Sequence, residues 1–296
     1  MKIMITGGLG HIGSKLIRTL SMDEIVVVDN LRTQRFCSLF SLPNNIKFIE
    51  KDINNLSNDD LKDIDIVIHL AAVVDAAGAD PKGIEEVNVK QTKEFIDQCI
   101  SMKVPKFIFP SSTSIYGTNS NKVYEDDKFI NPQSVYAESK VTIEEYLKVS
   151  DINYLIFRFG TIFGISPGMR FHTAVNRFCW DASLNRPLNI WKENYDQLRP
   201  YLDINDAINC IQHFIDCPEY INDTFNIVTD NYTASYVVDM IEHYIGPVKL
   251  NMVDSPLLNQ YSYEVSAYKA YKAGYSANGN LMLGISDTLE LLKGLT

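Results

Sequence analysis

Short apolar runs alternate with longer amphipathic stretches through the first half of the chain. The apolar runs are rich in isoleucine and valine, which predicts buried strands, and the stretches between them predict helices. The expected strands cover residues 2–6, 24–29, 46–50, 65–70, 106–110 and 153–159. The clearest expected helices cover residues 11–21, 84–102 and 133–149. This alternation is typical of a parallel sheet with helices on both faces, so the pattern predicts a doubly wound α/β fold.

The pattern becomes less regular after about residue 165. A loop and a helix are expected in 166–185, further helices at 203–217 and 233–245, and a strand at 224–228. No repeat and no long linker separates this part from the first. We therefore expect a large domain over 1–165, to which the strand near 224–228 returns, and a smaller C-terminal α/β lobe over 166–296.

Composition narrows the classes of protein that this chain can represent. With 296 residues, of which 46% are hydrophobic, it can bury a large core, and it has no apolar stretch that predicts a membrane span. The net charge of −10 is spread along the chain, which argues against a nucleic-acid partner. Five cysteines without a C-x-x-C pair predict free thiols in a reducing cytoplasm and no metal site.

The stretch "TGGLGHIGS" follows the first expected strand and leads into a helix. It places Gly7, Gly10 and Gly13 three residues apart. Glycines here allow a tight turn and a close approach to a pyrophosphate, which the helix N-terminus then faces. The spacing indicates a dinucleotide site, although an ordinary strand–helix turn would also use glycine.

Asp29 ends the second expected strand, where a carboxylate can accept both hydroxyls of an adenosine ribose. A carboxylate at this point repels a 2′-phosphate, which favours NAD over NADP. Arg32 and Arg35 follow closely and keep NADP open as an alternative. Asp52, after the third strand, could touch the adenine edge or be a simple cap or turn residue.

Three tyrosines have a lysine four positions later, the spacing that places two side chains on one helix face. These pairs are Tyr124–Lys128, Tyr136–Lys140 and Tyr268–Lys272. A tyrosine has a pKa of about 10 in solution, so nearby positive charge must lower it before the phenol can act as a base near neutral pH. Acids at 125–127 surround the first pair, and the third lies in a C-terminal stretch that resembles amphipathic surface. Tyr136 is therefore the preferred candidate base.

Hydroxyl residues at 111–114 follow the fifth expected strand, at the end where open α/β sheets bind ligands. A hydroxyl there could hydrogen-bond the oxygen whose proton Tyr136 removes. Serines after a strand are also common turn formers, and the sequence alone leaves that alternative open.

Taken together, these motifs resemble the extended short-chain dehydrogenases/reductases that act on nucleotide-sugars. The resemblance covers nearly the whole chain and rests on these stretches in this order: "TGGLGHIGS", "VVVDNL", "KDI", "HLAA", "NVKQT", "PSSTSIYG", "NPQSVYAESK", "FRFGTIFG", "LRPYLDINDA" and "AYKAGYSANGNLMLGI". It implies a Rossmann-type NAD-binding domain with a substrate-binding lobe, and a catalytic set of Ser112, Tyr136 and Lys140. It also implies NAD contacts from Gly7, Gly10, His11, Ile12, Gly13, Asp29, Asn30, Asp52, Ile53, Leu70, Ala71, Ala72, Asn88, Tyr136 and Lys140.

The same resemblance implies substrate contacts. Arg199 would pair with the nucleotide diphosphate, a task that suits a guanidinium, although it could equally be a surface arginine. His172 and Asn176 fall where the family places diphosphate and uridine contacts, and Thr113 follows the catalytic serine. Thr161 stands where the epimerases usually have asparagine, which leaves the sugar and its nucleotide open.

Residues beside Ser112 bear on the choice of reaction. Members of the family share a first oxidation to a keto-sugar. The 4,6-dehydratases carry an Asp-Glu pair directly after the catalytic hydroxyl residue, and the decarboxylases carry a glutamate at the second of these positions. Thr113 and Ser114 stand there in this chain, and the GDP-fucose synthase type has cysteine in place of Ser114. The residues present suffice for 4-epimerisation.

Other outcomes remain open at this stage. The enzymatic runner-up is a reductase of a 4-keto-sugar. A 4,6-dehydratase or a decarboxylase is the next alternative. A dinucleotide-binding regulatory protein on the same fold is the non-enzymatic alternative. The resemblance also implies a homodimer through the helices at 84–102 and 133–149, to which Phe95, Ile96, Ile143 and Leu147 could contribute apolar contacts, but a monomer that buries them against the sheet explains them equally well.

Overall fold

The computed structural model describes residues 1–22, 24–74, 81–117, 122–127, 130–254 and 263–295. Lys128, the expected partner of Tyr124, lies outside these ranges. Among the described residues, no helix has both the length and the apolar character needed to cross a membrane.

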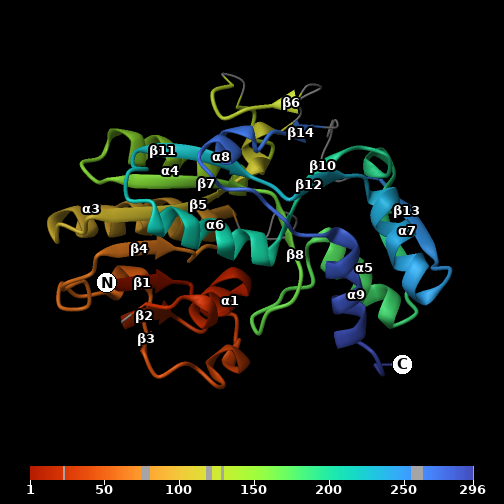
Figure 1. Ribbon diagram of the computed structural model, residues 1–296, viewed down its shortest axis with the longest axis horizontal. Coiled ribbons are helices and arrows are strands. Elements are labelled where there is room, and N and C mark those ends of the chain that lie inside the picture. Colours follow the sequence, from red (N-terminus) through yellow and green to blue (C-terminus); the bar gives the residue numbers. More distant parts are fainter. Residues whose placement is uncertain (23, 75–80, 118–121, 128–129, 255–262, 296) are drawn as a thin grey trace.

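A seven-stranded parallel sheet forms the centre of the molecule (Figure 1). Its strands, in spatial order, are β11 (Asp223–Ile227), β7 (Tyr154–Phe159), β5 (Lys106–Ser112), β4 (Ile66–His69), β1 (Lys2–Thr6), β2 (Glu24–Asp29) and β3 (Ile46–Glu50). Strand order reverses at β1, between β2 and β4. This is the strand order of a Rossmann-like doubly wound fold, so the predicted fold class is confirmed.

Helices cover both faces of this sheet. On one face α1 (His11–Thr19) and α6 (Ile204–Asp216) pack together, and their apolar residues share a buried core with β1, β2, β7 and β11. On the other face α3 (Thr92–Ser101) and α4 (Val135–Val149) bury their apolar residues against β1, β2, β4, β5 and β7. Helix α6 and strand β11 come from the second half of the chain, so this half contributes to the large core. The division at 165/166 itself stays a prediction.

The single helix expected over 84–102 is wrong in detail. The structure has a short helix α2 (Pro81–Ile84), a π-helical segment at Glu85–Gln91 and then α3. A π-helical turn inserts one residue into the helical repeat, and such turns are frequent at functional sites. This one carries Asn88.

A smaller lobe packs beside the carboxyl ends of the sheet (Figure 1). Its core joins α5, α7 and α9 to strand β9. Its helices are α5 (Ala174–Ser183), α7 (Ala234–Ile245) and α9 (Leu281–Leu291), whereas α8 (Tyr268–Lys272) packs on β11 of the large sheet (Figure 1). The small sheets pair β8 (Thr161–Phe163), β10 (Arg199–Asp203) and β12 (Asp230–Tyr232); β9 (Leu188–Trp191) and β13 (Leu250–Val253); and β6 (Lys122–Val123) and β14 (Glu264–Val265). Short 3-10 turns lie at Phe36–Leu39, Ile53–Asn55, Thr113–Tyr116 and Lys192–Asn194.

The apolar residues suggested for a dimer interface are inside the protein. Phe95, Ile96, Ile143 and Leu147 are each at most 1% exposed and belong to the core between the sheet and helices α3 and α4. The expectation that they supply contacts between subunits is therefore wrong, and their burial against the sheet explains them. The homodimer itself stays a prediction.

Candidate active site

The glycine loop lies at the point where the strand order reverses, directly after β1. Gly7 has φ +66°, and a Cβ on it would lie 2.6 Å from the backbone nitrogen of Ala71. A Cβ on Gly13 would lie 2.6 Å from the Cα of Gly8. Only glycine allows these approaches, and they leave the backbone after β1 open to a phosphate. The loop therefore fits a dinucleotide.

His11 connects this loop to a distant part of the chain. Its Nε2 donates a hydrogen bond to the carbonyl of Gly164 at 2.9 Å. The pKa of His11 is lowered to about 4, mainly by burial and also by the positive charges of Arg35, Arg170 and Lys15, against the effect of the bond to Gly164. The imidazole is therefore neutral near pH 7. The same three cations act on His11 at the end of the glycine loop, so they would also attract a pyrophosphate bound there.

Residues 164–170 cover the glycine loop, and we call them the cover segment. The backbone nitrogen of Gly168 donates to the hydroxyl of Ser14 at 2.8 Å, and the thiol of Cys37 donates to the carbonyl of Pro167 at 3.3 Å. A Cβ on Gly168 would lie 2.3 Å from the carbonyl oxygen of Leu9. The cover segment is thus fitted closely to the loop.

Acidic residues lie at the ends of β2 and β3, as predicted. The carboxylate of Asp29 accepts hydrogen bonds from the backbone nitrogens of Leu9 at 3.1 Å and Leu31 at 2.9 Å. Each carboxylate oxygen can accept a further bond, so ribose hydroxyls can still be bound. Asp52 makes no side-chain cap to the turn that follows it and instead accepts a hydrogen bond from the side chain of Asn30. Asn30 and Asp52, which are both predicted to contact NAD, are therefore joined.

Backbone bonds position the remaining residues predicted to contact NAD. Leu70 and Ala71 donate from their backbone nitrogens to the carbonyl and the hydroxyl of Thr6, at 2.9 and 3.5 Å. Ala72 follows them and is half-buried, as is Ile12 in helix α1, whereas Ile53 is buried.

Asn88 faces the interior of the protein. Its side-chain oxygen accepts from the backbone nitrogen of Val73 at 2.8 Å, and its amide donates to the carbonyl of Val73 at 2.9 Å. The amide also approaches the hydroxyl of Ser139 at 3.4 Å, and Ser139 donates to the carbonyl of Tyr136 at 2.7 Å. Asn88 therefore holds the chain after β4 next to the helix that carries Tyr136. Its direct contact with NAD stays a prediction.

The predicted catalytic residues come from β5 and α4, which pack together. Ser112 is the last residue of β5, and its hydroxyl accepts a hydrogen bond from the backbone nitrogen of Ser114 at 3.1 Å. Tyr136 and Lys140 lie in the first turns of α4, which begins after the capping residue Ser134. The ammonium of Lys140 donates to the carbonyl of Pro110 at 2.9 Å and lies 5.7 Å from the centre of the Tyr136 ring.

The charges around Tyr136 differ from the sequence expectation. Burial raises the pKa of Tyr136 to about 12, and the positive charge that opposes this rise belongs to Arg170 of the cover segment. Burial also lowers the pKa of Lys140 to about 8, against the effect of Glu144. In this arrangement burial of the phenol outweighs the positive charge that acts on it, and lowering of the phenol pKa by Lys140 together with the nicotinamide stays a prediction.

The residues predicted to contact substrate lie in different surroundings. Thr113 is buried and donates to the carbonyl of Phe159 at 3.3 Å, and Thr161 lies on β8, beside Tyr201 of β10. Arg199 begins β10, donates to the side-chain oxygen of Asn194 at 2.9 Å and is half-buried, so its alternative as a plain surface arginine is not favoured.

Tyr263 was not identified from the sequence. Its ring centre lies 5.2 Å from the guanidinium of Arg199, and its hydroxyl is hydrogen-bonded to Arg199 and to Thr113. Tyr263 therefore joins the predicted diphosphate residue to the neighbour of Ser112. A tyrosine in an irregular stretch has no spacing signal that would predict this contact.

Two further predictions fall in the segment after β8. His172 is exposed, whereas Asn176 is fully buried. Asn176 accepts from the backbone nitrogen of Gly164 at 3.1 Å and donates to the carbonyl of Arg170 at 3.0 Å. It thus holds both ends of the cover segment. Arg170, which the sequence reasoning missed, lies in the same stretch.

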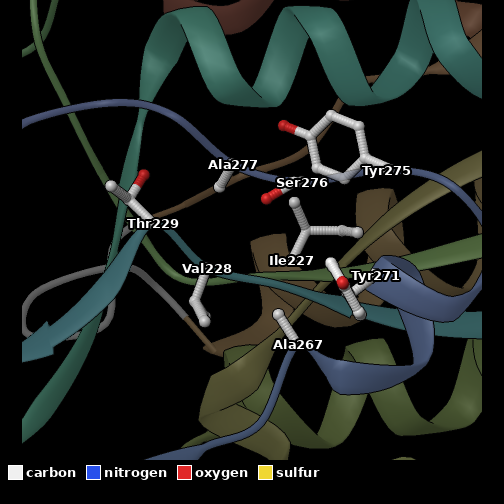
Figure 2. Close-up of a pocket in the computed structure, with 8 residues that line it drawn as sticks. All are labelled: Ile227, Val228, Thr229, Ala267, Tyr271, Tyr275, Ser276 and Ala277. Carbon is white, nitrogen blue, oxygen red and sulfur yellow. The ribbon is translucent and has the colours of Figure 1, made fainter.

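The other two tyrosine candidates lie away from this site. Tyr124 is 46% exposed and Tyr268 is 57% exposed. Figure 2 shows a hollow beside α8 and the end of β11, lined by Ile227, Val228, Thr229, Ala267, Tyr271, Tyr275, Ser276 and Ala277. It contains none of the predicted catalytic residues. In the part of the chain that the structure describes, no group of three or more His, Cys, Asp or Glu residues is arranged to hold a metal ion.

Comparisons with known proteins agree with this geometry. The model of the NAD dependent epimerase/dehydratase family matches residues 3–227. A Methanocaldococcus jannaschii protein with the provisional name UDP-glucose 4-epimerase is 26% identical, over 98% of each chain.

Solved structures extend the comparison. The UDP-glucuronic acid 4-epimerase of Bacillus cereus, solved with UDP-glucuronic acid and NAD, is 28% identical and superimposes over 100% of both chains with a TM-score of 0.90. An NAD-dependent NDP-hexosamine 5,6-dehydratase involved in tunicamycin biosynthesis is 25% identical, with 98% of this chain and 96% of the other covered and a TM-score of 0.83.

Proposed function

Because the chain belongs to the NAD-dependent epimerase/dehydratase family, we propose that it is a 4-epimerase of a nucleoside-diphosphate hexose. The observation that carries the proposal is the set of side chains beside Ser112. Tyr136 and Lys140 lie on the helix packed against β5, while the next two positions hold Thr113 and Ser114 and no carboxylate. Elimination of water would require an additional acid and base there, and epimerisation does not.

The proposed reaction begins with removal of the 4-hydroxyl proton by Tyr136. Ser112 hydrogen-bonds the same oxygen and directs the proton toward the phenol. Loss of this proton from oxygen and of a hydride from carbon leaves a 4-keto-sugar. The keto-sugar then turns over in the pocket, and the hydride returns to its other face while Tyr136 returns the proton.

Residues of the large domain would hold NAD. The loop at Gly7, Gly10 and Gly13 would receive the pyrophosphate, and Asp29 the adenosine ribose. NAD, when bound, supplies the hydride acceptor and donor and adds a positive charge beside Tyr136. Such a charge favours the phenolate, whose pKa burial has raised. The positive charge of Arg170 in the cover segment also favours the phenolate.

The nucleotide-sugar would lie between residues of the large domain and residues of the smaller lobe. Arg199 is proposed to bind the diphosphate, with Tyr263 holding its guanidinium in place. UDP is the nucleotide of first choice, because the Bacillus cereus epimerase was solved with a UDP-sugar. Thr113 and Thr161 are proposed to lie near the sugar, and His172 and Asn176 near the nucleotide, Asn176 by holding the cover segment.

A cytoplasmic location and a homodimer complete the proposal. All five cysteines are free, and Cys99, Cys179 and Cys210 are buried thiols, as suits a reducing compartment.

The test is a panel of nucleotide-sugars incubated with the purified enzyme and followed by NMR for the C4 epimer. The panel contains UDP-glucose, UDP-glucuronic acid, UDP-N-acetylglucosamine and the dTDP, GDP and CDP sugars. We expect epimerisation of a UDP-sugar without net consumption of NAD. Stoichiometric consumption of added NADPH would instead support the 4-keto-sugar reductase.

The Tyr136→Phe variant tests the proposed base. We expect kcat to fall by about 10²-fold to 10⁴-fold, because the phenylalanine ring cannot accept the proton. Tyr268→Phe is the matched control, since Tyr268 has the same spacing to a lysine but is exposed, and its kcat should equal that of the wild type. Full activity of Tyr136→Phe would contradict the proposal.

A further inference from the structure

A buried ion pair lies directly beneath the proposed catalytic residues. The guanidinium of Arg158 on β7 donates to the carboxylate of Glu144 on α4, with Nη2–Oε2 at 2.7 Å and Nε–Oε1 and Nε–Oε2 both at 3.2 Å. The two side chains are only 2% and 1% exposed. The sequence reasoning assigned no role to either residue.

Glu144 and Lys140 form hydrogen bonds with consecutive residues of β5. They are one helical turn apart on α4, so they face the strand together. The ammonium of Lys140 donates to the carbonyl of Pro110 at 2.9 Å, and the hydroxyl of Ser111 donates to Glu144 at 2.5 Å. Helix α4 is therefore bonded to the strand at the two residues that immediately precede Ser112. These bonds fix the position of Ser112 relative to Tyr136, which lies in the first turn of the same helix.

Arg158 holds the chain on the other side of Ser112. Its Nη1 donates to the hydroxyl of Tyr116 at 2.8 Å and to the carbonyl of Glu125 at 3.0 Å. Tyr116 ends the 3-10 turn that follows Ser112, and its hydroxyl donates to the side-chain oxygen of Asn226 on β11 at 2.7 Å. The pair thus contacts the chain both before and after the catalytic serine.

We propose that Glu144 and Arg158 are positioning residues for the reaction, which hold Ser112 in register with Tyr136 and Lys140 through Ser111 and Tyr116. This inference rests on the proposed function, because it assigns the pair a role in the same chemistry. We call the four residues Ser111, Tyr116, Glu144 and Arg158 the clamp.

Stability alone is a poor explanation for such a pair. Removing two charges from water offsets most of their attraction, so well-packed apolar residues of similar size are often as stabilising as a buried ion pair. Apolar residues cannot make hydrogen bonds, which depend on direction. The clamp makes directed hydrogen bonds at fixed distances, and small misplacements of catalytic groups lower rates steeply. Replacing the pair by apolar residues should therefore leave stability nearly unchanged and lower the activity.

The charge of Glu144 also acts on Lys140, whose other titratable neighbours are few. Tyr136 lies on the same helix and His69 faces Lys140 from β4. Burial keeps His69 neutral, with a pKa of about 3, and Arg170 of the cover segment acts on Tyr136. Glu144 raises the pKa of Lys140, so removing its charge should move the pH dependence that Lys140 controls to lower pH.

The first experiment compares Glu144→Gln and Ser111→Ala with Glu145→Gln. We expect Glu144→Gln to lower kcat by about tenfold to a hundredfold, with KM within about twofold, and to shift the pH profile of kcat to lower pH. Ser111→Ala keeps the ion pair and loses one bond of the clamp, so a fall of about tenfold is expected. Glu145 is exposed on the next position of α4 and pairs with the surface Lys148, so its variant should match the wild type in rate and profile.

The decisive variant replaces both charges, as Glu144→Leu together with Arg158→Met. We expect its thermal unfolding to stay near that of the wild type while kcat falls at least as far as in Glu144→Gln. Faster hydrogen exchange at backbone amides of residues 111–116 should accompany the loss, which reports loosening of the strand end without reference to turnover.

Wild-type kcat in a folded double variant, or in Ser111→Ala, would overturn the role of the clamp. A wild-type enzyme that turns over no nucleotide-sugar would instead contradict the proposed function. The two failures are distinguishable, because the first requires an active wild type.

Discussion

At the level of single residues, glycines with positive φ differ in what a side chain would meet. A Cβ on Gly7 would meet the backbone of Ala71, whereas a Cβ on Gly246, with φ +83°, would have nothing within 4 Å. Gly246→Ala should therefore show only the conformational cost, about 1–3 kcal/mol in the free energy of unfolding. Gly7→Ala should lower the free energy of unfolding by more than this, and it should also bind NAD more weakly.

Urea unfolding of both variants and calorimetric titration with NAD measure these effects. Comparing the two variants separates the cost of a positive φ from the cost of a clash between a Cβ at position 7 and the backbone of Ala71. An equal loss of stability in the two variants, with NAD binding retained in Gly7→Ala, would show that the loop tolerates a side chain.

Two buried histidines make stability depend on pH. Burial lowers the pKa of His11 to about 4 and that of His69 to about 3, from an ordinary value of 6.5 in the unfolded chain. Between about pH 4 and pH 6.5 the unfolded chain binds more protons than the folded protein does. The stabilisation is therefore complete above about pH 6.5 and is lost as pH falls toward 4. Each histidine can contribute up to roughly 1.4 kcal/mol per pH unit in that window.

Urea unfolding at pH 6.5 and 5 tests this prediction, since few carboxylates titrate in that range. We expect His11→Gln to lose less stability between these two pH values than the wild type does. His243→Gln is the control, because His243 is exposed on α7, and it should keep the wild-type dependence. Identical slopes for His11→Gln and the wild type would refute the role of His11.

At the level of elements, two helices have matched caps but different neighbours. The hydroxyl of Ser134 accepts from the backbone nitrogen of Ala137 at 3.2 Å at the start of α4, and that of Thr233 accepts from Tyr236 at 3.1 Å at the start of α7. Replacing either residue by alanine should cost about 1 kcal/mol of stability. Only Ser134→Ala should also lower kcat, because the first turn of α4 carries Tyr136.

Thermal unfolding and initial rates for both variants are the required measurements. Equal losses of kcat in Ser134→Ala and Thr233→Ala would mean that activity follows overall stability, and that the first turn of α4 has no special part in it.

The periodic pattern predicted most elements and missed those whose ends depend on long-range pairing. Strand β5 was expected to end at Pro110, where apolar residues stop. It continues to Ser112 because Ser111 and Ser112 pair with Arg158 and Phe159 of β7. The π-helical turn around Asn88 was missed, since one inserted residue barely alters an amphipathic pattern and its stabilising contact is the distant Val73.

The site shows the same division between local and distant signals. Glycines three residues apart and a tyrosine four before a lysine are local patterns, so the loop and Tyr136–Lys140 could be proposed from sequence. Arg170 acts on Tyr136, and Arg158 pairs with Glu144, only because the fold brings separate elements together. No spacing rule predicts such contacts.

At the level of the whole molecule, the outer surfaces of α3 and α4 bear on assembly. Their exposed residues are mostly charged: Glu94, Asp97, Glu138, Glu145 and Lys148. The hydroxyl of Tyr146 already donates to Asp97 at 2.6 Å within the chain. A homodimer through these helices would therefore bring mostly acidic surfaces together, and we expect its dissociation constant to fall between about 0.1 M and 1 M salt, because salt screens their repulsion. Sedimentation equilibrium at both concentrations measures this, and a dimer unaffected by salt would require another interface.

The two parts of the molecule meet where the cover segment lies on the glycine loop, and Gly168 is the closest point of that contact. A Cβ there would lie 2.3 Å from the carbonyl oxygen of Leu9 and 2.5 Å from that of Gly10. Both atoms are backbone, so Gly168→Ala must lift the cover segment. That movement breaks the bond to Ser14 and carries Arg170 away from Tyr136.

We therefore expect Gly168→Ala to bind NAD about tenfold more weakly, the equivalent of one or two lost hydrogen bonds, and to lower kcat as well. Ser14→Ala removes the same bond without displacing the backbone and should weaken NAD binding less, with kcat nearly unchanged. Calorimetric titration with NAD and initial rates give both quantities. If Gly168→Ala folds and matches Ser14→Ala in both, the cover segment does not couple the substrate side of the molecule to the cofactor loop.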